Sequence, residues 1–382
     1  MQTSIHRSTN YPWQDREKHL LASYAMHSID SQGREYDEPQ HQYRGPFQRD
    51  RDRVLHSAAF RRLSGKMQVF TGDMGDYHRT RLTHTHEVAS LARTIGRTLG
   101  LNEDLIEALA LLHDIGHPPY GHCGEDVLDE CLRESGGFSH NRFALDLVTR
   151  IEQRYTNYSG LNLTREVLSG QQFRSHKDLE ATPMLEIQVV DAADSAAYDA
   201  HDVDDALKLG LLNWEQLDGL ALVERARRVV PLDQTEPLRR RQLLVHTLIE
   251  LQISDLLEQS QRVLKPFWGK SATEVQVNRC RLQMTEAFAR EKEQLERFLF
   301  EHVYRHPRLI EIRQLAAARL RELFEFLAHH PSRLPERFQV LADSWGVQRS
   351  TGVYLAGMTD RFCEEQYQAL LVHKVERAAD WS

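Results

Sequence analysis

Apolar residues recur every three or four positions along most of the chain, which is the spacing of one face of an α-helix. In residues 83–100 this face carries Val88, Leu91, Ile95 and Leu99, and Gly100 follows as a helix end. No β–α–β order, regular repeat or low-complexity tract appears. We therefore predict an all-α fold, with a short hairpin near Met67–Asp76.

The next helix is expected over residues 102–116, with Asn102 as its N-cap and acidic residues in its first turn. Its apolar stripe contains Ile106, Leu109 and Ala110. The double proline of the HPPYG segment cannot continue a helix, so the chain must turn there. Further helical patterns cover residues 125–135, 141–155 and 184–210.

The character of the pattern divides the chain into three parts. Residues 1–45 are polar and without sustained periodicity, and they are expected to form an N-terminal arm. Residues 46–212 contain the compact helical patterns and are expected to form a core domain. Residues 213–382 carry long, charged amphipathic helices with prolines near their ends, as in a helical bundle packed on that core.

Composition narrows the class of protein. The 382 residues are 41% hydrophobic and 27% charged, which excludes a wholly disordered chain. No run approaches the roughly 18 apolar residues of a membrane span, and the N-terminus lacks the apolar core of a signal peptide. The four cysteines show no disulfide or zinc pattern. These features predict a soluble cytoplasmic protein that does not bind membranes.

Charge and histidine are unevenly distributed. The chain has a net charge of −8, yet residues 44–100 hold eleven Lys and Arg against five Asp and Glu, a local +6. Seven of the 20 histidines fall between His78 and His140. A locally basic segment can collect phosphates, although a solvated basic face explains the charge equally well.

Four side chains on different helical patterns are predicted to converge on one metal. His84 continues the apolar stripe of its helix, so it should point inward, and His113 does the same with Asp114 beside it. Asp194 begins a polar line on an otherwise apolar helix. A single inward histidine is usually a hydrogen-bonded core residue, but two imidazoles and two carboxylates suit a divalent cation.

The order His84, His113-Asp114, Asp194 resembles the H…HD…D signature of the HD-domain metal-dependent phosphohydrolases. Longer sequence motifs make the resemblance specific. Over residues 40–215 the chain is similar to the dGTPase group of deoxynucleoside triphosphate triphosphohydrolases. These motifs are RDRDRVLHSAAFRRLSGKMQVF, RLTHTHEV, ALLHDIGHPPYGHCGE, GLNLT and ADSAAYDAHDVDDAL. The resemblance implies an HD-domain helical core in residues 46–212.

Roles of individual residues follow from the same resemblance. It implies the metal ligands His84, His113, Asp114 and Asp194, and a catalytic histidine–carboxylate pair of His122 and Glu125. The residues that it implies at the substrate are Arg81 and His117 for phosphate, His140 as a further active-site histidine, and Gln68, Tyr198 and Asp202 around the deoxyribose. Tyr198 would pack under C2′ and exclude a 2′-hydroxyl.

The resemblance further implies hydrolysis of a deoxynucleoside triphosphate, with dGTP foremost, to the deoxynucleoside and inorganic triphosphate, in control of dNTP pools. Mn²⁺ or Mg²⁺ is the expected metal, with Fe²⁺, Co²⁺ or Ni²⁺ as alternatives. It also implies a homo-oligomer, a hexamer or tetramer, and single-stranded nucleic acid or a nucleotide effector as further partners.

Two other functions stay open from the sequence. One is an HD phosphohydrolase acting on a monophosphate, a cyclic nucleotide or guanosine tetraphosphate. The other is a nucleotide-sensing module that binds nucleic acid through the basic segment.

The sequence also leaves the roles of two residues open. Lys66 either binds the triphosphate or is exposed. His201 either contacts substrate, or is solvated or at a subunit interface.

Overall fold

The structure is a computed structural model that describes residues 11–68, 79–176, 182–232, 235–374 and 378–380. These residues form α-helices joined by short 3₁₀ and π-helical turns, with isolated bridges and no strand among them. The all-α prediction is confirmed. No helix in these ranges is both long and apolar enough to span a membrane.

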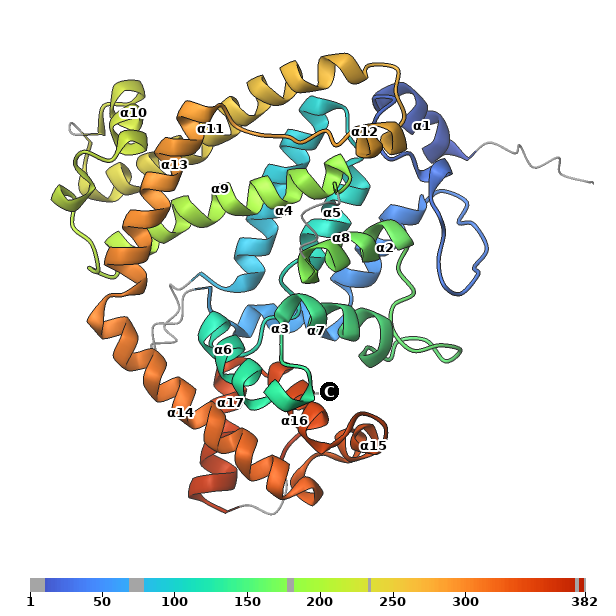
Figure 1. The fold of residues 1–382 in the computed structure, drawn as a ribbon, viewed down its shortest axis with the longest axis vertical. Helices are drawn as coiled ribbons and strands as arrows, with labels where there is room; N and C mark the ends of the chain where they lie inside the picture. Colours follow the sequence, from blue (N-terminus) through green and yellow to red (C-terminus); the bar gives the residue numbers. More distant parts are fainter. Residues whose placement is uncertain (1–10, 69–78, 177–181, 233–234, 375–377, 381–382) are drawn as a thin grey trace, which may run out of the picture.

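Among the described residues, the first half of the chain forms the α-helices α1 to α9 (Figure 1). They are α1 (Pro12–Leu20), α2 (Pro46–Leu55), α3 (Ala58–Arg62), α4 (Arg81–Leu99), α5 (Glu103–Leu112), α6 (Gly121–Cys131), α7 (His140–Asp146), α8 (Arg165–Ser175) and α9 (Leu185–Lys208).

The second half supplies the helices at the left and bottom of Figure 1, the long α11 at its top and the short α12 at the upper right, near α1. They are α10 (Ala221–Val229), α11 (Pro237–Leu264), α12 (Ala272–Val277), α13 (Glu286–Leu299), α14 (Pro307–His329), α15 (Glu336–Trp345), α16 (Val347–Ala356) and α17 (Asp360–Tyr367). A π-helical turn, η8 (Phe300–Tyr304), joins α13 to α14.

Local sequence sets the ends of the central helices as predicted. The Thr80 hydroxyl accepts the Thr83 N–H at the start of α4, and Gly100 ends that helix in the left-handed region at φ 69°. The Asn102 side chain accepts the Leu105 N–H at the start of α5. Helix α5 is shorter than expected, because it ends at Leu112 and the turn before the prolines begins at His113.

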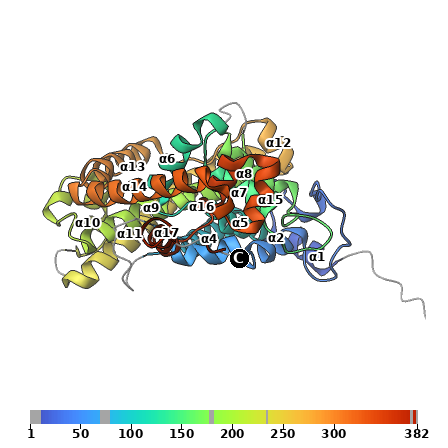
Figure 2. The same cartoon turned by 90° about the horizontal axis from the view of Figure 1, so that it is seen from below.

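Helices α4, α5 and α9 pack against one another and form the frame of the site. Helix α11 covers α9, and α14 packs on α6. Seen from below, the helices form a slab that is wider than it is thick (Figure 2). One apolar core joins Ile95 and Leu112 in this frame to Leu320, Phe338 and Tyr354 in the second half of the chain.

The segment predicted as an arm makes specific contacts from residue 11 onward. The Tyr24 hydroxyl donates to the Leu99 carbonyl at 2.8 Å, and the Met26 N–H donates to the buried Glu186 carboxylate at 2.9 Å. Arg34 forms a buried ion pair with Asp50. The division at residues 45 and 212 stays a prediction.

Only the base of the predicted hairpin lies within the described residues. Met67 and Thr80 form an antiparallel bridge, and the Gln68 N–H donates to the Arg79 carbonyl at 3.1 Å. Residues 69–78, which include His78, lie outside the described ranges. The bridge places Gln68 directly beside the start of α4.

Candidate active site

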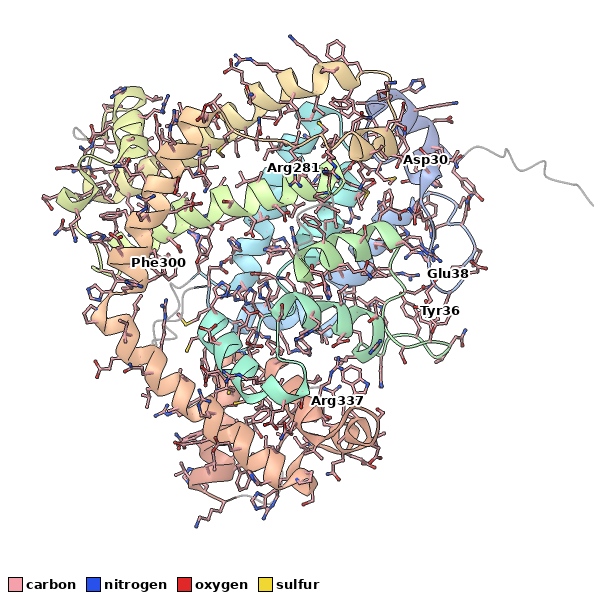
Figure 3. All side chains as sticks on the ribbon, viewed as in Figure 1. Asp30, Tyr36, Glu38, Arg281, Phe300 and Arg337 are labelled. Atoms are coloured by element: carbon pink, nitrogen blue, oxygen red, sulfur yellow. The ribbon has the colours of Figure 1, made fainter. Side chains whose placement is uncertain are left out.

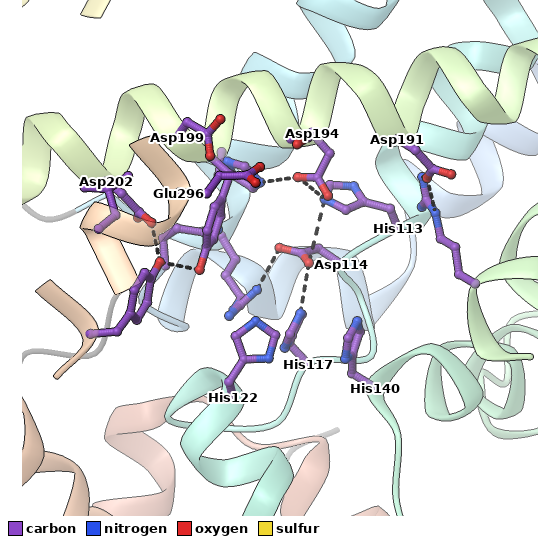
Figure 4. A pocket seen from close by; sticks show the side chains of 18 of the residues that line it. His113, Asp114, His117, His122, His140, Asp191, Asp194, Asp199, Asp202 and Glu296 are labelled. Atoms are coloured by element: carbon purple, nitrogen blue, oxygen red, sulfur yellow. Dashed lines mark hydrogen bonds and ion pairs between the residues drawn. The ribbon is translucent and has the colours of Figure 1, made fainter. Parts of the chain in front are cut away.

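A cavity of about 950 Å³ opens between the α4–α5–α9 frame and helix α6, and η8 and α14 form a further wall. All of the predicted site residues line it except Glu125, which contacts two of the lining histidines (Figure 4). Those on the wall are Gln68, Arg81, His84, His113, Asp114, His117, His122, His140, Asp194, Tyr198 and Asp202.

His84, His113 and Asp194 bring their ligand atoms within 4.8 Å of one another. His84 Nε2 lies 2.9 Å from Asp194 Oδ1, and His113 Nε2 lies 3.6 Å from the same oxygen. Burial acts to raise the pKa of Asp194, but His113 and His84 outweigh it and lower that pKa to about 2. An ionised carboxylate therefore faces two imidazoles.

The protonation of His113 fits a metal ligand. His113 Nδ1 lies 2.6 Å from the Ala110 carbonyl, so it carries the proton, and burial lowers the pKa of His113. The Nε2 atom of His113 is buried without a hydrogen-bond partner among the described residues. A neutral imidazole with an unpartnered lone pair beside a carboxylate is suited to coordinate a cation.

His84 is oriented from behind by two further residues. Its Nδ1 lies 3.5 Å from Nδ1 of His201, whose Nε2 lies 3.3 Å from the Glu87 carboxylate. His201 is 3% exposed and does not line the cavity. His201 contacts the metal-ligand candidate His84 on the side away from the cavity. It is therefore neither a substrate contact nor a solvated residue in this fold.

Asp114 lies at the edge of the metal cluster and is held by other groups. Its carboxylate accepts hydrogen bonds from Arg81 at 2.9 Å and His117 Nε2 at 3.1 Å. Its Oδ1 is 3.7 Å from His113 Nε2. Burial acts to raise the pKa of Asp114, but Arg81 and the neighbouring histidines hold it well below its usual range. Asp114 thus links the metal cluster to the phosphate-binding candidates.

His122, Glu125 and His140 form a second cluster. The Glu125 carboxylate lies 3.2 Å from His122 Nδ1 and 2.8 Å from His140 Nδ1, and it also accepts the His140 N–H at 2.9 Å. These bonds overcome the effect of burial and hold the pKa of Glu125 well below its usual range. Because Nδ1 of His122 is engaged, Nε2 is left for the cavity.

His117 completes this cluster by stacking on His140, with ring centroids 3.8 Å apart and planes 14° from parallel. The ligand atoms of these four residues also lie close together. However, nearly parallel stacked rings direct their in-plane lone pairs side by side instead of toward one ion. This geometry favours a hydrogen-bonded proton-transfer group over a second metal centre.

The far end of the cavity holds Tyr198, Asp202 and Tyr304. The Tyr304 hydroxyl donates to the Asp202 carboxylate and is hydrogen-bonded to the Tyr198 hydroxyl. Burial raises the pKa of Asp202 to about 8. The two tyrosine rings are parallel within 8°. This arrangement is a polar anchor beside a flat aromatic surface.

Sequence reasoning missed the residues that close the cavity from the second half of the chain. Figure 3 labels two of them, Arg281 before α13 and Phe300 at its end. Tyr304 on η8, Arg305 just after it and Arg313 on α14 follow. The sequence around these residues predicts only a charged amphipathic helix, and no local motif marks them as cavity residues.

Lys66 corrects a further expectation, because it neither lines the cavity nor is exposed. It is 2% exposed, and its ammonium donates to the carbonyl oxygens of His117 and Ala356. Lys66 therefore supports the loop that carries His117 instead of contacting a phosphate directly.

Gly116, just before His117, allows a close approach of α7. A Cβ atom there would lie 2.0 Å from the His140 carbonyl oxygen and 2.6 Å from the Ala144 nitrogen. Gly116→Ala is expected to lower the free energy of unfolding by about 2–4 kcal/mol and to separate His117 from His140. Urea unfolding measures this loss. Gly210→Ala is the control, because its Cβ meets nothing within 4 Å and only its positive φ costs about 1 kcal/mol.

Comparison with known proteins agrees with this geometry. Residues 81–199 match the HD domain family, and residues 282–369 match a family described as a phosphohydrolase-associated domain. The chain is 40% identical over 371 residues to a deoxyguanosinetriphosphate triphosphohydrolase-like protein of Geobacter metallireducens, covering 93% of this chain and 96% of the relative. The chain belongs to this family.

Other members of the family are similarly close. The Brucella canis protein of the same description is 38% identical over 381 residues, or 91% of this chain and 95% of its own. The Ralstonia nicotianae protein is 38% identical over 376 residues, or 94% and 97%. The predicted family is therefore confirmed, and membership supports a phosphohydrolase.

Proposed function

We propose that this chain hydrolyses deoxynucleoside triphosphates, dGTP foremost, to a deoxynucleoside and inorganic triphosphate. The observation that carries the proposal is one cavity that joins a His84–His113–Asp194 metal cluster, a Glu125-bound His122 and the Tyr198–Asp202 surface. The descriptions of the relatives as deoxyguanosinetriphosphate triphosphohydrolase-like agree with it.

His84, His113 and Asp194 would hold the divalent ion, with Asp114 beside them. Mixed nitrogen and oxygen ligands suit Mn²⁺ or Mg²⁺, with Fe²⁺, Co²⁺ or Ni²⁺ as alternatives. When bound, the ion supplies Lewis acidity at the α-phosphate and lowers the pKa of water. Arg81 keeps Asp114 ionised and lies next to the position where the triphosphate charge would collect.

His122 would move the proton. Glu125 accepts the hydrogen bond from His122 Nδ1, which fixes the ring and leaves Nε2 for proton transfer. As water oxygen bonds to the α-phosphorus and loses a proton, the bond from phosphorus to the deoxyribose oxygen would break, and a protonated Nε2 would donate its proton to that leaving oxygen. Cleavage of the bond between the α-phosphorus and the deoxyribose oxygen releases triphosphate intact. A pyrophosphatase instead cleaves between two phosphates.

Tyr198 and Asp202 would select the sugar. Asp202, held by the Tyr304 hydroxyl, offers an acceptor to a sugar hydroxyl, and the Tyr198 ring would lie under C2′. The 2′-hydroxyl of a ribonucleotide would lie against this ring without a hydrogen-bond partner. Burying an unpaired polar group in this way would weaken the binding of the ribonucleotide. Deoxyribonucleotides should therefore be preferred to ribonucleotides.

The test is incubation of the purified protein with each dNTP and rNTP in Mn²⁺ or Mg²⁺, with triphosphate resolved from other products. We expect triphosphate from dGTP, little from GTP, loss of turnover with EDTA and recovery with excess Mn²⁺. Orthophosphate or pyrophosphate as the first product would contradict the proposal and favour another HD phosphohydrolase reaction.

A further inference from the structure

Helix α17 and the segment before it reach the active-site loop through a buried carboxylate. Asp360 is 2% exposed, and its two oxygens accept different backbone hydrogen bonds. Oδ1 accepts the Tyr120 N–H at 2.9 Å, and Oδ2 accepts the Met67 N–H at 2.9 Å. Asp360 therefore joins two segments that lie 240 and 293 residues away in the sequence.

Both of these segments lead directly into the cavity. Met67 immediately precedes Gln68, and Tyr120 is the N-cap of α6, two residues before His122. Lys66 adds a bond of the same kind, because its ammonium bridges the His117 and Ala356 carbonyl oxygens. The loop from His117 to Tyr120 is thus fixed at both ends by contacts that involve the C-terminal part of the chain.

The backbone of Tyr120 explains why the loop needs this support. Its φ is 66° and its ψ is 16°, in the left-handed region that a bulky residue rarely adopts. Such a conformation costs of order 1–3 kcal/mol and persists only where the surroundings impose it. The Tyr120 side chain is also hydrogen-bonded to Cys363 on α17, so this helix holds the residue at its backbone and its ring.

We propose that Asp360 is a positioning residue for catalysis, which fixes the left-handed turn at Tyr120 and so aims His122 at the reacting phosphorus. The proposal rests on the role given to His122 under the proposed function. It assigns a task to the phosphohydrolase-associated region, residues 282–369, which contains Asp360 but none of the metal-ligand candidates.

The metal cluster offers an internal reference. His84 lies on α4 and Asp194 on α9, whereas the hydrogen bonds of Asp360 go to Tyr120 and to Met67, which pairs with Thr80 before α4. Loss of the Asp360 bonds should therefore disturb α6 directly and leave metal affinity near that of wild type. A residue that only stabilised the fold would not separate these two properties.

The experiment compares the full-length Asp360→Asn variant with wild type. An amide keeps the size of the side chain but retains one acceptor oxygen, so one of the two N–H groups loses its partner. We expect kcat to fall about 10- to 100-fold, which is the usual effect of misplacing a reacting group. The Mn²⁺ dissociation constant should stay within about threefold, since the metal-ligand candidates lie outside the two segments that Asp360 holds. KM for dGTP is not a criterion, because Gln68 and His117 adjoin those segments.

Hydrogen exchange supplies a readout that does not depend on turnover. Peptides that cover residues 117–124 should exchange faster in Asp360→Asn, while peptides of α9 and of α4 beyond its first turn should exchange as in wild type. Glu365→Gln is the matched control on the same helix, because its exposed pair with Arg361 is remote from the loop. It should change neither kcat nor exchange.

If Asp360→Asn does not fold, Asp360→Glu carries the test, because it keeps the charge and both acceptors but extends the arm by one methylene. A folded variant with wild-type kcat and wild-type exchange at residues 117–124 would overturn the proposal. A variant that loses Mn²⁺ affinity together with kcat would do the same. If the wild-type protein releases no triphosphate, the proposed function fails, whereas exchange still decides whether Asp360 braces the loop.

Discussion

His122→Ala is expected to lower kcat for triphosphate release by about 10²–10⁴-fold, the usual range for loss of a general acid or base. The His122 side chain is 61% exposed and contacts Glu125, so its removal opens no core cavity. Mn²⁺ affinity and the unfolding midpoint should stay as in wild type. Steady-state kinetics, calorimetric titration of Mn²⁺ and urea unfolding measure the three properties.

His86→Ala is the control for this experiment. His86 lies on α4, is exposed, and packs its ring edge against Phe60 instead of facing the cavity. Its removal should leave kcat unchanged. Full activity in His122→Ala would refute the role of the His122–Glu125 pair, and loss of Mn²⁺ with His122→Ala would assign His122 to the metal instead.

Asp114→Asn should affect both stability and metal binding. The substitution leaves Arg81, 2% exposed, without its buried counterion, and breaking one partner of such a pair costs about 3–5 kcal/mol. It also removes a negative charge beside His113, so the Mn²⁺ dissociation constant should rise by at least about tenfold. Urea unfolding without metal and calorimetric Mn²⁺ titration separate the two effects.

Glu364→Gln provides the comparison for stability. It breaks the pair with Arg319, in which both side chains are about one-third exposed, so the cost should be below about 1 kcal/mol. A loss below about 1 kcal/mol in Asp114→Asn as well would contradict the buried pair.

Because the pKa of Asp114 is lowered in the fold, the ionised Asp114 contributes to the free energy of unfolding above its unfolded pKa of about 3.9. This contribution disappears as the pH falls further.

The sequence predicted those features that depend on one helix at a time. Helix periodicity placed His84 inward, and the residue is 1% exposed. Gly100 and Asn102 carry cap chemistry that acts within a few residues, and both caps are present. His84 and Asp194 lie on long helices whose apolar stripes define their inner faces, whereas the other candidate residues were expected from the family resemblance. Their individual roles stay predictions.

Features that depend on tertiary packing could not be predicted in this way. Tyr304 and Arg313 look like ordinary residues of a charged helix, and their place in the site depends on the packing of α13 on α9 and of α14 on α6. Lys66 was assigned to phosphate or solvent because a lysine is rarely buried. Its partners are backbone carbonyls that no side-chain pattern reveals. The expected hexamer or tetramer likewise stays a prediction.

Helix α9 carries Asp194 near the metal cluster and Asp202 at the sugar surface, eight residues later on the same rigid rod. At 1.5 Å per residue these carboxylates are separated by about 12 Å along the axis. The helix therefore fixes the separation between the metal-ligand candidate Asp194 and the Asp202–Tyr304 hydrogen bond without help from any loop. Phe300 on η8 and Arg305 just after it form a wall of the cavity that does not belong to α9. Substitutions in that wall can thus change the lining of the cavity without changing the separation of the two carboxyl groups.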